Sequence, residues 1–491
     1  MCRRQQEEKM GNNDGMNYAP VGKPKPVVKL REFVITAIYK AGFTDQFVRL
    51  PILPEDEYYR GDGIQKNAIH FYKKGKALDC LSAEEIKVEA MQLTGRRKKA
   101  MDRVRMGVIG IGSMGSAHAM QIHKGRVEGM TLTAVCDTDP LRLEWAAEEF
   151  GKEPFFYTDY HDLISSGKID AVLIATPHPM HPVIAKEALQ KGLHVLTEKP
   201  EGIDAATAEE VNRTAQKSGC VYGIMYNQRT NPLFAELRRR FQKGELGELI
   251  RFSWTITNWY RTQAYYDSGS WRATWTGEGG GVLMNQCPHN LDIWQWMVGM
   301  PKRLIANCRI AHFHDIEVED EAEIYAEYDN GATGVFLTST GEYPGTNRLE
   351  ISGTKGKAVI EDGTLTLQLL EQDIREITAA STECMPHCEI KTIKISQKEP
   401  ESGHLGILND FSRAIRKGTK LLVPGEEGIF GLSIANAAYL SSWTHEWVEF
   451  PTDGEVYRAE LRRRQQSSAE RKPVRGQNIT GEYSERWRVK W

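Results

Sequence analysis

The pattern of apolar and polar residues divides the chain into a strand–helix part and a mainly β part. From residue 104 onward, short apolar runs alternate with longer amphipathic stretches. This alternation predicts a parallel, doubly wound sheet with right-handed crossovers, because each buried parallel strand needs a helical connection to the next one. The predicted strands are 104–109, 132–136, 155–157, 170–175, 194–197 and 221–225, and the predicted helices include 116–124, 141–150, 180–191 and 205–218.

After residue 229 the pattern becomes β-rich. The run IEVEDEAEIYAEY at 316–328 alternates charged and apolar residues, which is typical of a sheet with one covered face and one exposed face. The turn sequences at 329–331 and 353–356 suit hairpins, so we expect an α+β domain with a large, mainly antiparallel open sheet. Strands are predicted at 249–260, 303–313, 319–328, 333–339, 348–352 and 357–360, and helical segments at 231–241 and within 403–447.

The first predicted turn carries the glycine spacing of a dinucleotide site. Gly110, Gly112 and Gly115 follow a strand and precede a helix, with Ser113 and Met114 inside the turn. Gly110 permits the tight turn, Gly112 lets the backbone approach a pyrophosphate, and Gly115 lets the helix pack closely on the strand. The helix N-terminus offers N–H groups and a positive dipole end to the phosphates. The alternative is a purely structural glycine turn.

The end of the second predicted strand carries an acid. Asp137 lies 22 residues after Gly115 (137 − 115), at the position where a carboxylate accepts the ribose hydroxyls of adenosine. The same carboxylate repels a 2′-phosphate. The sequence therefore predicts NAD as the cofactor in preference to NADP.

Two loops at later strand ends face the same crevice, since ligands of such sheets bind beyond the carboxyl ends of the strands. Lys199 precedes a proline, which holds it in an extended or turn geometry and lets it project rigidly; the alternative is a surface lysine. His178 and His181 suggest a metal, but no third ligand is evident, so a place along the cofactor crevice or at the start of the next helix is preferred. The candidate cofactor-binding residues from these loops are Thr176, Pro177, His178, His181, Glu198 and Lys199.

A glycine run at 279–281 opens the second candidate site element. On a continuous helix Asn285 and His289 are four residues apart and share a face, and Asp292 lies close to it. A histidine between an amide and a carboxylate suits general acid/base chemistry. A lone helical histidine packed in the core is the equally weighted alternative.

Aromatic residues mixed with arginine and asparagine precede this run. Such a mixture can stack on the C–H faces of a polyhydroxylated ligand and hydrogen-bond its hydroxyls. A sheet core or a subunit interface would use the same residue types. The candidate substrate-binding residues are Asn227, Tyr260, Arg261, Tyr266, Trp271, Arg272, Asn285 and His289.

Composition excludes other classes of function. The chain of 491 residues has a net charge of −3, which gives no electrostatic case for binding nucleic acid. No apolar run approaches the roughly 20 residues that span a bilayer, and the N-terminus lacks the apolar segment of a secretory signal. The eight scattered cysteines are expected to be free thiols in a reducing cytoplasm. The cysteine pair around His387 lacks a second ligand pair at zinc spacing, so no metal is expected.

These motifs together resemble the Gfo/Idh/MocA family, which includes glucose–fructose oxidoreductase and inositol dehydrogenase. The matching segments are GVIGIGSMG at 107–115, ATPHPMH at 175–181, HVLTEKP at 194–200, GGGVLMNQCPHNLD at 279–292 and GTNRLEISGTKGKAVIE at 345–361, together with Asp137. The resemblance implies a Rossmann domain, an α/β domain whose open sheet often forms oligomers, and NAD(P)-linked chemistry at a sugar-like hydroxyl. It also implies that Lys199 orients the reacting hydroxyl, that the bond before Pro200 is cis, and that His289 is the acid/base.

The sequence pattern and the resemblance together suggest a domain organisation, in which the roughly 100 residues before Arg103 have no counterpart in the usual family layout. We expect an N-terminal accessory or partly ordered segment at 1–102, with an extended arm at 23–29, a strand at 32–38 and a basic linker at 96–99. An NAD-binding Rossmann domain at 103–228, a substrate and oligomerisation domain at 229–464 and a polar tail at 465–491 follow. The expected partners are a small sugar-like substrate and further copies of the chain.

The chain departs from the family at one position that carries chemistry. Many members have the pattern D-x-G-x-H where this chain has Asn285 and Cys287, and an amide cannot take a proton. Lys199 with His289 would then have to suffice. The first hypothesis is an NAD-dependent dehydrogenase of sugar or cyclitol hydroxyls. The alternatives are a glycoside-cleaving enzyme that recycles bound NAD, and a non-catalytic regulator that binds NAD and a sugar.

Overall fold

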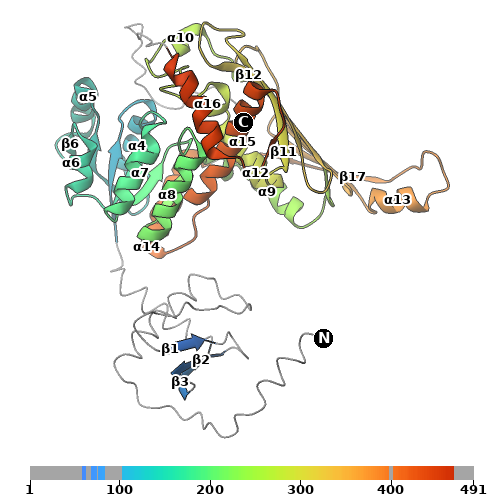
Figure 1. Cartoon of the computed structure of the whole chain (residues 1–491), viewed down its shortest axis with the longest axis horizontal. Coiled ribbons are helices and arrows are strands. Elements are labelled where there is room, and N and C mark those ends of the chain that lie inside the picture. Colours follow the sequence, from blue (N-terminus) through green and yellow to red (C-terminus); the bar gives the residue numbers. More distant parts are fainter. Residues whose placement is uncertain (1–57, 62–67, 74–75, 83–101, 398–401, 469–491) are drawn as a thin grey trace. The chain divides into compact units, whose positions relative to one another are not determined.

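The computed structural model describes residues 58–61, 68–73, 76–82, 102–397 and 402–468. The chain divides into two compact units, Met1–Met101 and Asp102–Trp491. In the first unit β1 (Tyr58–Gly61), β2 (Ala68–Lys73) and β3 (Lys76–Ser82) pair as an antiparallel sheet in that order (Figure 1). The arm expected at 23–29, the strand at 32–38 and the linker at 96–99 lie outside the described residues.

The second unit begins with a parallel sheet of six strands in the order β6-β5-β4-β7-β8-β9. This confirms the predicted fold class and each predicted strand to within two residues at either end. Because β5 lies on one side of β4 and β7 on the other, the strand order reverses at β4. Sheets of this kind bind their ligands at such a reversal. The strands are β4 (Val104–Ile109), β5 (Met130–Cys136), β6 (Phe155–Tyr157), β7 (Ala171–Ile174), β8 (His194–Thr197) and β9 (Tyr222–Ile224).

Helices connect these strands. α4 starts at Ser113, three residues before the predicted start, because Gly112 already serves as its N-cap. Asp139 and Asp204 cap α5 and α8 by accepting backbone N–H groups, as expected of N-cap carboxylates. The helices are α4 (Ser113–His123), α5 (Pro140–Phe150), α6 (Tyr160–Ser165), α7 (Met180–Gln190), α8 (Ala205–Ser218) and the short η1 (Asn227–Thr230).

A second sheet of nine strands follows, in the order β17-β16-β15-β14-β10-β13-β12-β11-β18. It is antiparallel except for the parallel pair β10–β13, so the prediction of a mainly antiparallel sheet is confirmed. Two predicted strands are too long, since β10 ends at Ile256 and β11 at Ile310. The strands are β10 (Leu249–Ile256), β11 (Arg303–Ile310), β12 (Glu319–Glu327), β13 (Thr333–Ser339), β14 (Asn347–Gly353), β15 (Gly356–Glu361), β16 (Thr364–Leu370), β17 (Ile390–Ser396) and β18 (Val448–Glu449).

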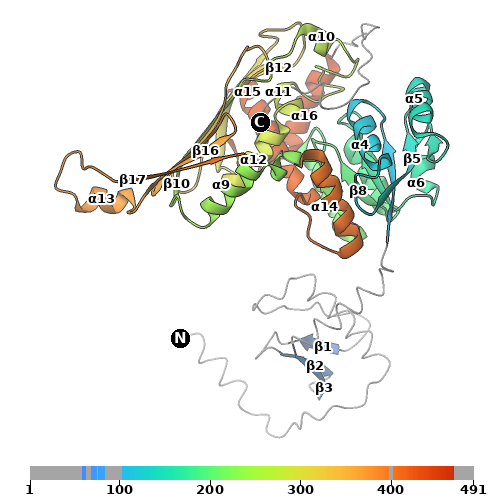
Figure 2. The same cartoon turned by 180° about the vertical axis from the view of Figure 1, so that it is seen from behind.

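Helices cover one face of this sheet (Figures 1 and 2). The indole of Trp294 on α12 stacks on Phe252 of β10, with ring centroids 5.1 Å apart, and on Phe336 of β13 at 5.9 Å. All three side chains are fully buried, so this aromatic contact fixes α12 on the sheet. The helices of this part are α9 (Pro232–Gln242), α10 (Gln263–Tyr266), α11 (Val282–Asn285), α12 (Pro288–Val298) and α15 (Gly428–Thr444).

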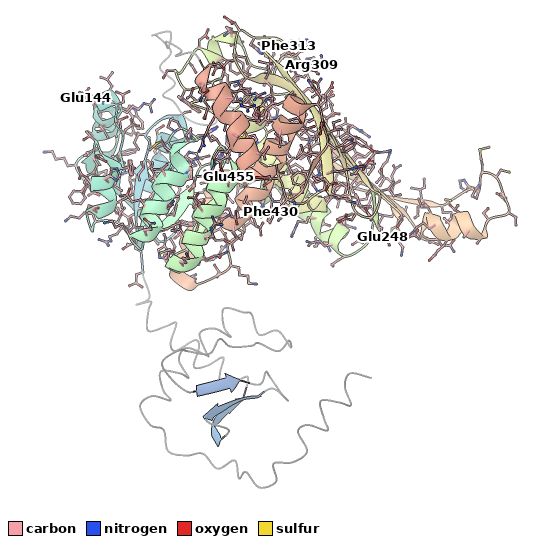
Figure 3. All side chains as sticks on the ribbon, in the orientation of Figure 1. Glu144, Glu248, Arg309, Phe313, Phe430 and Glu455 are labelled. Carbon is pink, nitrogen blue, oxygen red and sulfur yellow. The ribbon has the colours of Figure 1, made fainter. Side chains whose placement is uncertain are left out.

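An arm extends from the edge of the sheet, between β16 and β17 (Figure 1). It contains α13 (Ile374–Ala380), which has no buried residue. The arm is anchored at its base, where the Thr354 hydroxyl donates to Asp373 at 2.7 Å and Arg375 pairs with Glu248 at 2.9 Å. Figure 3 shows Glu248 at this end of the sheet and Glu144 on α5 in the Rossmann part, both of them exposed.

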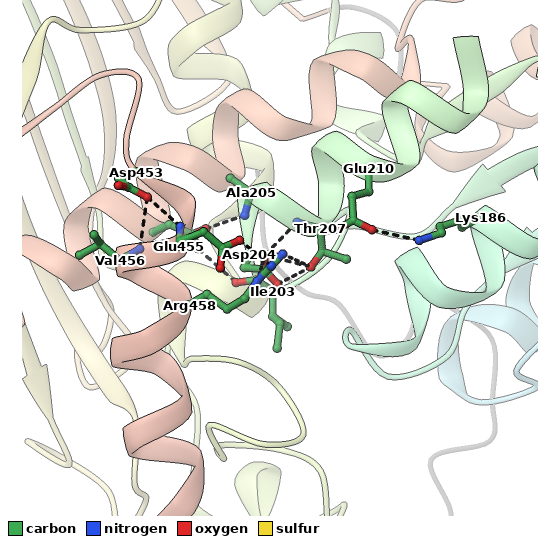
Figure 4. A network of polar contacts seen from close by, with 11 residues as sticks. Lys186, Ile203, Asp204, Ala205, Thr207, Glu210, Asp453, Glu455, Val456 and Arg458 are labelled. Carbon is green, nitrogen blue, oxygen red and sulfur yellow. Dashed lines mark hydrogen bonds and ion pairs between the residues drawn. The ribbon is translucent and has the colours of Figure 1, made fainter. Parts of the chain in front are cut away.

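The C-terminal helices return to the Rossmann part. The helical pattern predicted within 403–447 forms α14 (Gly403–Lys417) and α15, separated by the short η2 (Gly425–Glu427). A further helix, α16 (Gly454–Gln466), is capped by Asp453 and bound to the start of α8, since Arg458 donates to Asp204 at 2.9 Å and to Thr207 at 2.9 Å (Figure 4). The expected boundary of the tail at 465 falls within α16, and residues 469–491 lie outside the described part. Among the described residues, no helix is both long and apolar enough to cross a membrane.

Candidate active site

The glycine turn between β4 and α4 has the geometry of a dinucleotide turn. Gly110 has a φ of +90°, and a Cβ there would lie 2.6 Å from the carbonyl oxygen of Ala175. A Cβ on Gly115 would lie 1.7 Å from the carbonyl oxygen of Gly110, so helix and strand are in close contact. A Cβ on Gly112 would meet only the tip of the Arg142 side chain, at 3.0 Å. The fold therefore requires glycine at positions 110 and 115, whereas Gly112 leaves the backbone accessible to a ligand.

The acid at the end of β5 lies against this turn. Asp137 is 8% exposed, and its Oδ2 accepts the backbone N–H of Ile111 at 2.7 Å. Its Oδ1 accepts the N–H of Asp139 at 2.9 Å, and the Arg142 guanidinium lies 3.4 Å from Oδ2. Oδ1 accepts one of these hydrogen bonds and can accept a second one from a ligand. The position and the chemistry both fit the ribose of a dinucleotide.

The loop after β7 forms the opposite wall. Within the described chain, the buried hydroxyl of Thr176 has no hydrogen-bond partner, so it is available to a ligand. Pro177 is exposed, and His178 is buried with its Nδ1 2.9 Å from the carbonyl oxygen of Glu278. His181 lies between the carbonyl oxygens of Thr176 and Pro200, at 2.7 and 2.8 Å. Both imidazoles therefore hold loops in place, and no cluster of metal ligands occurs in the described residues.

The loop after β8 carries a buried carboxylate and a lysine. Glu198 accepts a 2.6 Å hydrogen bond from Nε2 of His118 on α4. Burial works to raise the pKa of Glu198, but the hydrogen bond and charge of His118 lower it to about 2. The bond between Lys199 and Pro200 is cis, as the resemblance implied. Glu198 is therefore ionised next to Lys199 and tied to the cofactor-binding helix.

Lys199 reaches from the first domain to the second. Its Nζ donates a 2.8 Å hydrogen bond to the carbonyl oxygen of Asn285, the last residue of α11. Burial lowers the pKa of the ammonium below its usual 10.5, and the carboxylates of Glu198 and Glu278 oppose this effect. The side chain thus projects into the region between the domains, as the sequence predicted.

His289 lies in the first turn of α12, where it is 7% exposed and packs edge-on against the ring of Tyr226 at 6.0 Å. Burial, and then the positive charge of Lys199, lower the pKa of His289 well below 6.5. The imidazole is therefore neutral at physiological pH and can accept a proton. Lys199 binds the main chain of Asn285, which lies four residues before His289 in the sequence.

The prediction that one continuous helix places His289 between Asn285 and Asp292 was wrong. α11 ends at Asn285 and α12 starts at Pro288, so no continuous helix places Asn285 on a face with His289. The break follows from Pro288, which lacks an N–H group and disfavours helical geometry in the residue before it. Asp292 instead binds Arg229, which donates to its two oxygens at 2.8 and 2.6 Å.

The side chain of Asn285 binds a carboxylate that the sequence reasoning missed. Its Nδ2 donates to Oε1 of Glu278 and, at 3.3 Å, to the hydroxyl of Tyr265. Glu278 is 2% exposed and its Oε2 accepts the N–H of Ala273 at 2.7 Å. Glu278 immediately precedes the glycine run, which was the one signal that could have identified it.

The predicted substrate residues separate into two groups. Arg261 and Arg272 both lie close to the ring of Tyr265, with their guanidinium carbons 5.0 and 4.7 Å from its centroid. Trp271 packs against His178 at 5.4 Å. Tyr266, by contrast, is buried and its hydroxyl contacts Thr340, and Tyr260 is 44% exposed and packs on Tyr343.

A further histidine that the sequence analysis missed, His404, belongs to α14. His404 lies 3.4 Å from the side-chain nitrogen of Asn227 and its ring is 5.4 Å from that of His118. Burial lowers the pKa of His404 to about 3. No local pattern marks this residue, because α14 lies more than 170 residues away from Asn227 in the sequence.

These features define a two-domain nucleotide-dependent enzyme with its site at the junction of a Rossmann sheet and an open sheet. Residues 104–226 match the family described as the oxidoreductase family with an NAD-binding Rossmann fold, and residues 234–359 match the GFO/IDH/MocA C-terminal domain. The chain therefore belongs to the Gfo/Idh/MocA family of oxidoreductases, and NAD, the predicted cofactor, is the dinucleotide of its first domain.

Individual relatives are similar over different shares of the chain. The scyllo-inositol 2-dehydrogenase (NAD(+)) of Bacillus subtilis is 27% identical over 346 residues, which cover 68% of this chain and 93% of the relative. A glycosyl hydrolase family 109 protein of a Shewanella species is 32% identical over 204 residues, covering 37% of this chain and 42% of the relative. The fold matches that of the WlbA dehydrogenase from Bordetella pertussis, solved with NADH and UDP-GlcNAcA, with a TM-score of 0.60 at 24% identity over 72% of this chain and 100% of that one.

Proposed function

We propose that this enzyme transfers a hydride between a hydroxyl-bearing carbon of a sugar or cyclitol and NAD. The observation that supports the proposal is the 2.8 Å hydrogen bond from the Lys199 ammonium to the carbonyl oxygen of Asn285, which brings this lysine of the first domain against the helical segment that carries His289. Relatives named inositol dehydrogenases support the substrate class. The nicotinamide of bound NAD supplies the hydride acceptor.

The residues of this chain would divide the remaining work. Lys199 holds the reacting oxygen and stabilises the negative charge that develops on it. His289, being neutral, takes the hydroxyl proton as the hydride leaves and returns it in the reverse direction. The residues proposed to hold NAD are Gly110, Gly112, Ser113, Met114, Gly115, Asp137, Thr176, Pro177, His178, His181, Glu198 and Lys199.

The proposed substrate pocket combines cations with aromatic rings. Arg272 donates to the hydroxyl of Tyr265 at 2.9 Å, which leaves its other N–H groups for ligand oxygens. Arg261, Trp271 and Asn227 complete the pocket we propose. We retain Tyr260 at its rim, and we assign the buried Tyr266 to support of the loop.

A panel of sugars, sugar acids, cyclitols and glycosides tests the proposal. The purified protein is mixed with NAD and each compound, and NADH is followed by its absorbance. We expect NADH with at least one cyclic polyol or sugar and none with glycosides that lack a free hydroxyl at the reacting carbon. A full panel without any NADH and without any product would remove the proposal.

A second candidate is supported by the relatives named glycosyl hydrolase family 109 proteins. In that case the site oxidises a glycoside transiently to ease cleavage and returns the hydride, so NAD is recycled. Release of the free sugar from an aryl glycoside without NADH in solution would select this candidate. A protein that binds NAD and sugar with neither outcome would be the regulator instead.

The open face of the nine-stranded sheet is the surface through which we propose that copies of the chain associate. Tyr325 of β12 and Val335 of β13 are cross-strand partners and each is 38% exposed on this face. Residues 1–102, 103–228, 229–464 and 465–491 remain the proposed segments. The six described cysteines are free, which supports a reducing cytoplasm as the proposed compartment.

A further inference from the structure

Hydrogen-bond donors surround the carboxylate of Glu278. Its Oε2 accepts the backbone N–H of Ala273 at 2.7 Å, its Oε1 accepts the side-chain amide of Asn285, and Nη1 of Arg272 lies 3.9 Å from Oε1. Burial raises the pKa of Glu278 above 4.5, and the charge of Arg272 and the N–H of Ala273 oppose this rise. Because each of these contacts comes from a donor, the ionised carboxylate is the form that this environment satisfies.

The loop that presents Glu278 is constrained on both sides. Ala273 has a φ of +53°, a conformation that residues with a Cβ rarely adopt and that persists where the surroundings impose it. The N–H of Glu278 donates to the carbonyl oxygen of Thr274 at 3.0 Å. Its own carbonyl oxygen contacts Nδ1 of His178, from the Rossmann domain, at 2.9 Å. Both domains therefore fix the position of this carboxylate.

Asn285 connects this carboxylate to Lys199. Its side chain binds Glu278, and its main-chain carbonyl oxygen accepts the Lys199 ammonium at 2.8 Å. Position 285 is the one at which the chain has an amide in place of the family's carboxylate. We propose that Glu278 is a positioning residue that restores this negative charge one side chain further away, orienting the Asn285 amide and balancing the Lys199 ammonium.

The proposal rests on the proposed function and has a consequence that does not depend on turnover. The charged groups facing Lys199 are the carboxylates Glu198 and Glu278 and the guanidinium groups of Arg261 and Arg272, and the buried His178, His181, His289 and His404 feel its charge in turn. Removing the charge of Glu278 leaves two guanidinium groups opposed by one carboxylate. The pKa of Lys199 must then fall.

The first experiment measures this pKa by chemical labelling. Acetic anhydride acylates the neutral amine, and mass spectrometry of the full-length protein after digestion follows the extent at Lys199 against pH. We expect Glu278→Gln to lower the midpoint by about 0.5 pH unit or more. The control is Glu201→Gln, which removes another fully buried carboxyl, bound to the Tyr222 hydroxyl, and should leave the midpoint unchanged. An unchanged midpoint in Glu278→Gln would overturn the proposal.

The second experiment moves the carboxylate. Glu278→Gln should lower kcat about 10- to 100-fold with the KM for NAD unchanged. The double variant Glu278→Gln with Asn285→Asp, which restores the family's acid, should regain at least about 5-fold of this loss. No rescue combined with a lower melting temperature would assign Glu278 a purely structural role and overturn the proposal. If the wild-type protein oxidises no compound, the proposed function fails, and the labelling experiment still decides the role of Glu278.

Discussion

Nζ of Lys199 donates a 2.8 Å hydrogen bond to the carbonyl oxygen of Asn285, and this contact joins the two domains at the candidate active site. An ammonium carries three donors, so two remain for a substrate oxygen. Since the acceptor is a main-chain carbonyl, the position of the ammonium depends on the backbone of α11 and not on the identity of residue 285. The same anchoring would hold with aspartate there.

Lys199→Ala and His289→Ala should each reduce turnover by roughly 10²- to 10⁴-fold, because each removes a group that holds or moves the reacting proton. The dissociation constant for NAD should change far less than turnover, since the glycine turn and Asp137 remain even where Lys199, one of the proposed NAD contacts, is removed. Stopped-flow or steady-state NADH absorbance and calorimetric NAD titration measure the two quantities. Lys186→Ala removes a lysine of α7 whose salt bridge to Glu210 is exposed, and it should leave turnover unchanged. Equal turnover in all three variants would contradict the assignment.

Alanine at two glycines should separate folding from cofactor binding. Gly110→Ala places a Cβ 2.6 Å from a carbonyl oxygen at a φ of +90°, and should destabilise the protein by about 1–3 kcal/mol. Gly112→Ala meets only the flexible Arg142 tip, so the fold should persist while NAD binds about 10-fold or more weakly. Thermal unfolding without NAD and calorimetric titration with NAD test the pair. Normal NAD affinity in Gly112→Ala would place the pyrophosphate elsewhere.

Asp292→Ala should destabilise the protein by about 3–5 kcal/mol, because it leaves the guanidinium of Arg229 buried with only Glu427 to oppose its charge. Arg229 is 2% exposed, so water cannot replace the lost carboxylate. Denaturant unfolding measures the change. Arg213→Ala breaks the exposed pair with Glu209 and should cost under about 1 kcal/mol. Similar costs for both variants would mean that Arg229 finds another partner.

Glu319→Gln should change how stability depends on pH. Glu319 is fully buried and accepts the N–H groups of Gly281 and Leu283 and the hydroxyl of Tyr439, and burial raises its pKa to about 7. A raised carboxyl pKa contributes stability that is present below pH 4.5 and lost as pH rises through 7. The difference between wild type and variant should therefore shift by about 3 kcal/mol in favour of the variant between pH 4.5 and pH 8. A constant difference across this range would mean that Glu319 is ionised throughout.

Val335→Glu should weaken self-association, because it places a charge in the middle of the exposed sheet face opposite Tyr325. Light scattering coupled to gel filtration reports the mass. We expect an oligomer for the wild type and a shift toward the monomer for the variant, with an unchanged circular dichroism spectrum. A wild-type monomer at all concentrations would remove the proposed interface. Lys391→Glu on the exposed β17 is the matched control and should not change the mass.

The Rossmann part could be predicted from the sequence because short stretches of consecutive residues determine its strands and its first turn. Fully buried parallel strands such as β7 are continuous apolar runs, and the glycine turn fixes where the first helix begins. β16 and β17, at the edge of the large sheet, were missed. β17 is largely exposed, and polar residues separate its three isoleucines. α16 was missed because only Tyr457 and Leu461 are buried, so its apolar face is a single pair of residues four positions apart in a largely polar sequence.

The candidate site could be predicted only in part, because some of its residues have partners that are far away in the sequence. Lys199 and His289 sit in motifs with a fixed local geometry, and the structure brings Lys199 against Asn285, four residues before His289. The partner of Asp292 is 63 residues away and that of Asn227 lies 177 residues away, so spacing along one helix suggested the wrong neighbours. Pro288 was the overlooked local signal, since it ends one short helix and starts the next.

The central claim is that Lys199 and His289 act on a substrate hydroxyl while its hydride passes to NAD. The most direct test uses the compound that reacts best in the panel, with deuterium at the carbon bearing the reacting hydroxyl, and mass spectrometry of the dinucleotide recovered from the enzyme. The account predicts deuterium at the nicotinamide with the wild-type protein, and transfer at least about 100-fold slower with Lys199→Ala. Product formation with no deuterium in the dinucleotide, or equal transfer in both proteins, would contradict it.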